Sequence, residues 1–128
     1  MIRYLNLEEV IYIYSEIIER TGGQAGIAEE KVLENVLEKP MVQFEGEEIY
    51  PDIFTKTAVL MYAMVNSRPF VDGNKRAALA CTIFLLKANG YQIVSSQDNI
   101  VEVIKGTSEG KYHVDYLVNW LKRNTVLV

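Results

Sequence analysis

Hydrophobic residues recur at helical spacing along most of the chain, and this pattern predicts a helical protein. The first helical segment begins after Asn6, a plausible N-cap, and ends at Gly22–Gly23. A second helix is predicted from Ala28 to Lys39, and Pro40 stops it because proline cannot continue a helix. Residues 41–51 mix acidic and apolar side chains without a period and are predicted to form a loop.

The two longest apolar helical segments lie in the middle of the chain. The first begins after Asp52, another plausible N-cap, and extends to about Asn66. The second ends at Asn89–Gly90, a typical C-terminal stop, and its apolar run is broad enough for a buried helix. We therefore expect these two helices to form the centre of the fold.

The last third of the chain predicts two more helices. Residues 91–94 are extended in character and indicate a short strand or a buried connection. One helix is predicted from Asp98 to about Ser108, and the last begins near Val114. Because the sequence contains no repeat or linker, we predict one all-α domain, residues 1–128, of about six helices joined by short loops.

Composition and charge exclude several classes of function. The chain has 128 residues, 49% of them hydrophobic and 23% charged, which is typical of a globular domain. A net charge of −4 argues against non-specific nucleic-acid binding as the main function. The single cysteine, Cys81, excludes a disulfide framework, and no apolar run approaches the length of a membrane span. We expect a cytoplasmic protein that has no direct contact with nucleic acid or membrane.

The residues most able to carry chemistry lie between the two central helices. This segment, the motif loop, reads Arg68-Pro69-Phe70-Val71-Asp72-Gly73-Asn74-Lys75-Arg76. Backbone N–H groups at a helix start lack partners, and the helix dipole favours an anion there. Gly73 permits close approach of the backbone, while Lys75 and Arg76 add positive charge. Asp72 offers a carboxylate to magnesium, which prefers one or two carboxylates plus phosphate oxygens. The motif loop therefore predicts a phosphate-binding site.

The motif loop resembles the signature of the Fic/Doc family, His-x-Phe-x-Asp/Glu-Gly/Ala-Asn-Gly/Lys-Arg. Lys75, where most Fic enzymes have glycine, resembles the Doc branch, the "death on curing" toxins of toxin–antitoxin modules. The resemblance covers nearly the whole chain, since its length, the Gly22–Gly23 turn, the Pro40 break and the Asn89–Gly90 stop also fit. It implies a single-domain Fic/Doc-like helical bundle with the motif loop between two central helices.

The resemblance also implies an activity and partners. Doc-like toxins are protein kinases that transfer the γ-phosphate of ATP to a hydroxyl of elongation factor Tu and so block translation. In this chain, the resemblance implies that Asp72 holds Mg²⁺ and takes part in catalysis with Lys75 and Arg76, which neutralise the phosphates. Phe70, Gly73 and Asn74 complete the implied cofactor-binding set together with Lys75 and Arg76, and Phe70 is also expected to anchor the loop in the core. The implied partner is an antitoxin whose disordered C-terminal tail folds as a helix over the site.

Arg68 departs from the family, which has its catalytic histidine at this position. That histidine is the general base, whereas an arginine stays protonated and offers only hydrogen-bond donors. The only histidine of the chain is His113, far from the motif loop in sequence. We therefore expect an inactive or badly impaired enzyme, through either an introduced substitution or a natural loss. A third interpretation is that Arg68 grips phosphate while another group acts as base.

Several alternatives remain open from the sequence. Transfer of AMP, as in Fic proteins, is disfavoured by Lys75, and a catalytically dead module that binds nucleotide or antitoxin is a further candidate. Asp72 is expected to cap the following helix when no nucleotide is bound. Arg20 belongs either to the rim of the site or simply to a helix C-terminus that favours a cation. The acidic residues from Glu45 to Glu48 are expected to form a solvated loop, which the resemblance places near the site.

Overall fold

Six α-helices dominate the fold, which we describe from a computed structural model covering residues 1–128. The helices and strands, in chain order, are α1 (Leu7–Thr21), α2 (Glu30–Glu38), the short 3₁₀ helix η1 (Lys39–Met41), β1 (Gln43–Phe44), β2 (Glu47–Glu48), α3 (Ile53–Ser67), α4 (Asn74–Ala88), β3 (Tyr91–Ile93), α5 (Gln97–Ser108), α6 (Val114–Arg123) and β4 (Thr125–Leu127). The predicted all-α class with about six helices is confirmed. None of these helices combines the length and the hydropathy that crossing a membrane requires.

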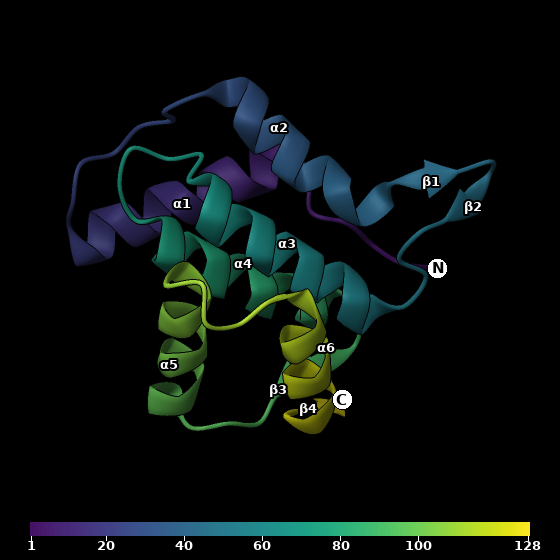
Figure 1. The fold of residues 1–128 in the computed structure, drawn as a ribbon. Coiled ribbons are helices and arrows are strands. Elements are labelled where there is room, and N and C mark those ends of the chain that lie inside the picture. Colours follow the sequence, from purple (N-terminus) through teal and green to yellow (C-terminus); the bar gives the residue numbers. More distant parts are fainter.

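Helices α3 and α4 occupy the centre of the molecule, as the sequence predicts. Figure 1 shows them side by side, with α1 and α2 on one side and α5 and α6 on the other. Most residues of α3 are buried, and residues from every helix join one continuous hydrophobic core. Because α3 and α4 run in opposite directions, the loop that joins them lies at one end of the bundle, beside the C-terminal end of α1.

The helix boundaries follow the expected local signals at most positions. The Asn6 side chain accepts a hydrogen bond from the Glu9 backbone N–H, and the Glu9 side chain accepts one from Asn6, which completes a capping box. Asp52 caps α3 by accepting from the Thr55 backbone N–H (2.9 Å) and hydroxyl (2.7 Å). Gly22 ends α1 with φ 84°, a conformation that suits glycine.

Some boundaries differ from the prediction. Helix α2 begins at Glu30 rather than at residue 28, and the chain continues past it into η1. Pro40 lies in the first turn of η1, where its missing N–H is not needed. Helix α5 begins one residue before Asp98, because the Ser96 side chain caps it. Residues 91–93 form a strand, which is one of the two alternatives predicted for residues 91–94, but its partner β4 near the C-terminal end of the chain has no counterpart in the prediction.

The predicted loop of residues 41–51 is wrong in one respect, since β1 and β2 form a small antiparallel hairpin there. Glu45 (φ 52°) and Gly46 (φ 81°) make its turn, and both adopt the positive φ values that a tight hairpin turn requires. Asn-Gly or Asp-Gly would have signalled such a turn, but Glu-Gly is a weak signal. The hairpin projects beyond the N-terminal end of α3 in Figure 1.

A buried lysine ties this hairpin to the core. Lys56, in the first turns of α3, is completely buried, and its Nζ donates to the Glu48 carboxylate (2.8 Å) and the Pro40 carbonyl (2.9 Å). The Tyr4 ring lies 5.2 Å from the same Nζ. Burial, the largest single influence, works to lower the pKa of Lys56, but the hydrogen bonds and charges of Glu48 and Tyr4 together outweigh it and the pKa is raised. The hydrogen bond from Lys56 and its charge lower the pKa of Glu48.

The Lys56–Glu48 pair predicts a pH dependence of stability. Because the folded-state pKa of Glu48 lies below its ordinary value of 4.5, its contribution is present above that value and is lost as the pH falls through the lowered pKa. We expect the Glu48→Gln variant to be less stable at neutral pH. Its free energy of unfolding should also fall less steeply than that of the unchanged chain between about pH 5 and about pH 3. Urea denaturation at several pH values measures this.

The matched control is Glu47→Gln, which removes an exposed carboxylate of the same hairpin that makes no ion pair. This variant should keep the pH slope of the unchanged chain. Equal slopes for the Glu48 and Glu47 variants would contradict the assigned role of the pair.

Candidate functional site

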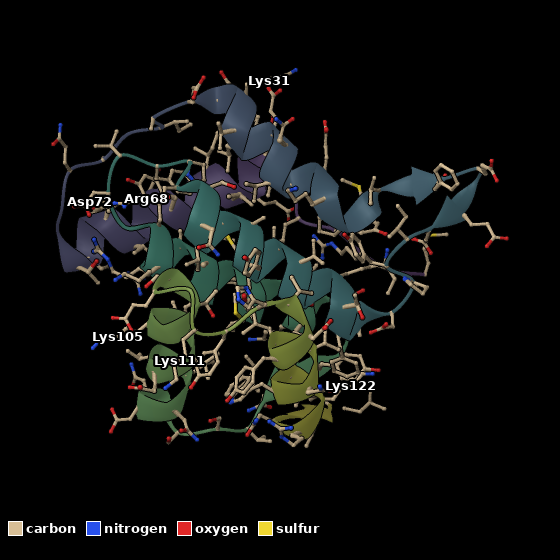
Figure 2. All side chains as sticks on the ribbon, viewed as in Figure 1. Lys31, Arg68, Asp72, Lys105, Lys111 and Lys122 are labelled. Atoms are coloured by element: carbon tan, nitrogen blue, oxygen red, sulfur yellow. The ribbon has the colours of Figure 1, made fainter.

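A polar hollow of about 470 Å³ lies at the end of the bundle where α3, α4 and α5 meet. Six of its nine lining residues come from the motif loop and the first turn of α4, namely Arg68, Asp72, Gly73, Asn74, Lys75 and Arg76. The other three are Val65, Asn66 and Ser108, from the C-terminal ends of α3 and α5. Figure 2 labels Arg68 and Asp72 at this end of the molecule. Of the site residues predicted from the sequence, only Phe70 is absent from the lining.

The segment that follows α1 holds the motif loop in place. The Val71 backbone N–H donates to the Gly26 carbonyl (2.9 Å), and the Ala28 N–H donates to the Pro69 carbonyl (2.8 Å). These bonds flank an antiparallel bridge between Ile27 and Phe70. Part of the connection between α1 and α2 is thus a short extended segment paired with the motif loop.

Phe70 anchors the motif loop in the core, as expected. Its side chain is 2% exposed and stacks on the ring of Tyr14, with centroids 3.8 Å apart. The Tyr14 hydroxyl donates to the Asp72 carbonyl (2.7 Å), so α1 fixes the loop at two points. The Phe70 side chain is therefore buried beneath the hollow and does not face it.

Asn74 closes the motif loop from inside. Its Oδ1 accepts from the Phe70 N–H (2.9 Å), and its Nδ2 donates to the Phe70 carbonyl (2.9 Å). The side chain is 8% exposed, so both bonds are shielded from water. Although Asn74 belongs to the lining, its amide group is used to maintain the loop.

The N-terminus of α4 opens on the hollow without a side-chain cap. Gly73 is the N-cap residue, with φ 82°, and the first backbone bond of the helix runs from the Ala77 N–H to the Gly73 carbonyl. The amides of residues 74–76 therefore precede the helical hydrogen-bond ladder, and they lie at the positive end of the helix dipole. A Cβ at Gly73 would come within 3.0 Å of Ile18 Cδ1, so position 73 lacks space as well as requiring positive φ. This end of α4 has the features of an anion site.

Asp72 does not cap α4, so the expected capping role is wrong. Its Oδ1 accepts from the Gly73 N–H (2.8 Å), and its Oδ2 accepts from the Gln24 N–H (3.2 Å) on the segment after α1. The carboxylate makes no hydrogen bond to the amides of residues 74–76. A Cβ at Gly23, which has φ 113°, would lie 2.6 Å from Asp72 Oδ2, so glycine is needed for this approach.

The three cations of the hollow differ in how they are held. Arg76 Nη1 donates to the Thr21 hydroxyl and to the Gly22 carbonyl (2.8 Å), and its Nη2 lies 3.8 Å from Asp72 Oδ1. Arg68 and Lys75 are exposed, and their side chains form no hydrogen bond or ion pair within the protein. Arg76 thus joins α4 to the end of α1, while the other two cations are free to bind an anion.

Arg68 ends α3 in the left-handed conformation, with φ 51° and ψ 60°. Few side chains other than glycine adopt this conformation readily, but histidine is among those enriched in it. The backbone at position 68 is therefore suited to the residue that the family signature has there.

Other residues considered from the sequence lie away from the hollow. Arg20 is exposed at the end of α1 and pairs with Glu16 (3.8 Å), which fits the helix C-terminus interpretation. His113 precedes α6, and its Nδ1 contacts the Tyr62 hydroxyl (3.4 Å). The acidic hairpin lies at the N-terminal end of α3, whereas the motif loop lies at its C-terminal end (Figures 1 and 2), so its expected place near the site is wrong.

The hollow contains polar residues that the sequence did not single out. Asn66 precedes the motif loop by two residues, and the sequence alone indicates only that it lies at the end of a helix. Ser108 enters the site because α5 packs beside α4, and no local pattern signals this contact. These two residues and the buried Val65 complete the lining of the hollow.

Comparison with known proteins agrees with the geometry. A family model described as the Fic/DOC family matches residues 4–86. The chain is 28% identical over 121 residues to the protein kinase doc of Escherichia phage P1, which covers 94% of each protein. It is 30% identical over 98 residues to the toxin Doc of Mycolicibacterium smegmatis, covering 77% of this chain and 73% of that protein.

Proposed function

The chain belongs to the Fic/DOC family, and from this membership we propose that it is a Doc-like toxin built to transfer the γ-phosphate of ATP to a protein hydroxyl. Elongation factor Tu is the proposed target, so that transfer would block translation. The proposed partner is an antitoxin whose disordered C-terminal tail covers the site. Arg68 leaves this form without a general base and hence inactive in transfer.

The proposal rests on one observation, namely that the motif residues line a single hollow at the start of α4. The helix amides, Lys75 and Arg68 all present hydrogen-bond donors there, and phosphate oxygens are acceptors. The hollow has the volume of a small-molecule site and is shaped by the fold without a ligand. Phosphoryl transfer depends mainly on positioning and on stabilising charge, which fits a site made of fixed donors.

Asp72 suits the magnesium ion that accompanies ATP. Its side chain is about half exposed, and each oxygen accepts one backbone hydrogen bond, so each retains a lone pair for a metal. No group of three or more acidic, histidine or cysteine side chains gathers to bind a metal by itself. A single carboxylate is sufficient for magnesium, because phosphate oxygens and water supply its other ligands. Magnesium would draw charge from the phosphates, and Asp72 would hold it beside Lys75.

Transfer also requires a group that accepts a proton. When a target hydroxyl attacks the γ-phosphorus, the bond to the β-phosphate oxygen breaks and the hydroxyl proton must leave. Arg68 has no lone pair for that proton. It is instead a further cation beside the phosphates, so nucleotide binding is expected to survive where transfer is lost. This favours the catalytically dead binding module as the second candidate function.

Binding of the magnesium–ATP complex tests the proposed site. Replacing Lys75 with methionine keeps the length of the side chain but removes its charge. We expect affinity to fall about tenfold to a hundredfold, because a charge-assisted hydrogen bond to phosphate is lost. Isothermal titration calorimetry of the unchanged chain and the variant measures the difference.

The matched control is Lys87→Met, at the other end of the same helix, where the side chain is exposed. Its affinity should equal that of the unchanged chain. Equal losses in the two variants would show a general effect of charge, and the absence of saturable binding in the unchanged chain would reject the site.

A further inference from the structure

The C-terminal end of α1 touches the hollow through one of its cations, Arg76. We infer that Thr21 is a positioning residue for Arg76: together with the Gly22 carbonyl, it fixes one end of the guanidinium and leaves the other edge for an anion in the hollow. The inference rests on the proposed function, because that anion is the triphosphate of the nucleotide. Thr21 does not line the hollow, so its effect on the anion must pass through Arg76.

The contacts with α1 use only one of the three guanidinium nitrogens of Arg76. Its Nη1 donates one hydrogen to the Thr21 hydroxyl and the other to the Gly22 carbonyl (2.8 Å). Nε and Nη2 donate no hydrogen bond within the protein, and Nη2 lies 3.8 Å from Asp72 Oδ1, beyond hydrogen-bond distance. The tie between α4 and α1 therefore leaves the hydrogens of Nε and Nη2 for a ligand.

The remaining edge of Arg76 has the geometry that phosphate requires. The Nε–H and the neighbouring Nη2–H of a guanidinium point in parallel and can bind two phosphate oxygens together. The Arg76 side chain is 38% exposed and lines the hollow, so an anion there can reach it. Arg68 and Lys75 form no contact that would order them, whereas Arg76 is held before the anion arrives. A donor that is already ordered loses less conformational entropy when it binds.

The Thr21 hydroxyl is itself oriented to accept a hydrogen bond. Its single hydrogen is donated to the Ile17 carbonyl (2.7 Å), one helical turn earlier on α1. Only lone pairs of Oγ1 therefore remain for Arg76. Valine has the shape of threonine without the hydroxyl, so Thr21→Val removes this acceptor while Thr21→Ser keeps it. Because residue 21 is exposed, neither change should disturb the core.

The residues that follow Thr21 hold the second charged group of the site, Asp72. The Gln24 backbone N–H donates to Asp72 Oδ2 (3.2 Å). A Cβ at Gly23 would lie 2.6 Å from this oxygen and 3.1 Å from Arg76 Nη2, so glycine allows the backbone to approach both groups. Residues 21–24 thus support the carboxylate proposed for magnesium and the arginine proposed for phosphate at the same time. This shared support indicates that the segment serves the site as well as joining two helices.

The test is a calorimetric titration with the magnesium complex of inorganic triphosphate. We expect Thr21→Val to bind it about tenfold more weakly than the unchanged chain, because the guanidinium is no longer fixed. Thr21→Ser should recover most of the affinity lost in the valine variant. The control is Ser15→Ala, which removes an exposed hydroxyl of the same helix outside these contacts and should bind like the unchanged chain.

A double-mutant cycle with Arg76→Met separates positioning from a general effect on α1. If Thr21 acts through Arg76, Thr21→Val should cause no further loss of affinity once the guanidinium is absent. A tenfold loss that persists in the Arg76→Met background would overturn the inference. So would a serine variant as weak as the valine variant, and this comparison does not depend on the folding of Arg76→Met.

The unchanged chain separates failure of this inference from failure of the proposed function. If it binds magnesium triphosphate and Thr21→Val binds equally well, only the positioning role of Thr21 is rejected. If the unchanged chain binds neither triphosphate nor ATP with magnesium, the hollow is not a phosphate site, and both the proposed function and the inference fail.

Discussion

Replacing Arg68 with histidine is expected to raise the rate of γ-phosphate transfer to elongation factor Tu by about 10²–10⁴-fold. This is the usual contribution of a positioned general base, and histidine is the side chain best suited to the role near neutral pH. The backbone should accept the change, because residue 68 has φ 51° and histidine tolerates this left-handed conformation better than most residues. Incorporation of labelled γ-phosphate into the purified factor measures the rate.

Arg68→Gln is the control for this prediction. It removes the arginine cation, as the histidine variant does, but it supplies no base. Its rate of phosphate transfer should therefore equal that of the unchanged chain. If the glutamine variant gained as much activity as the histidine variant, the effect would come from loss of the positive charge. Transfer by the unchanged chain at the rate of the histidine variant would contradict the claim that position 68 must supply the base.

The second large effect is expected for Asn74→Ala, which should lower the free energy of unfolding by about 2–4 kcal/mol. The two bonds between the Asn74 side chain and the Phe70 backbone are buried, and alanine would leave the N–H and the carbonyl of Phe70 without partners. Each unsatisfied buried group costs about 1–3 kcal/mol. Urea denaturation followed by circular dichroism measures the change.

Two further variants test this explanation. Asn99→Ala, at an exposed position of α5, should change stability by less than about 0.5 kcal/mol. The loss of stability in Asn74→Asp should lie between the losses in Asn74→Ala and Asn99→Ala. A carboxylate accepts from the Phe70 N–H but has no hydrogen to donate to the Phe70 carbonyl. An alanine variant as stable as the unchanged chain would show that solvent reaches the motif loop and satisfies Phe70.

The central features of the fold could be predicted because their signals are local. Helices α3 and α4 are long and apolar, and their ends have an Asp cap and an Asn-Gly stop that act through neighbouring residues. The six motif residues that line the hollow belong to one segment of nine residues between these helices, so no long-range contact was needed to bring them together. A functional motif whose residues are contiguous in the sequence can therefore be recognised from the sequence alone.

The rest of the site depends on tertiary packing. Asp72 looks like a helix cap in sequence, but the backbone N–H of Gln24, 48 residues earlier, holds one of its carboxylate oxygens. Ser108 reaches the hollow only because α5 packs beside α4. Tyr14 supports the motif loop from α1 through a ring stack and a hydroxyl, although its sequence pattern indicates only a core residue. Local spacing contains none of this information.

The most direct test of the central claim, that the hollow at the start of α4 is a nucleotide-phosphate site, is a crystal structure with magnesium and a non-hydrolysable ATP analogue. We predict the triphosphate at the N-terminus of α4, with its oxygens within hydrogen-bond distance of the Lys75 ammonium and the magnesium ion on Asp72. A nucleotide bound elsewhere on the protein, or bound here with its phosphates turned away from α4, would contradict the account.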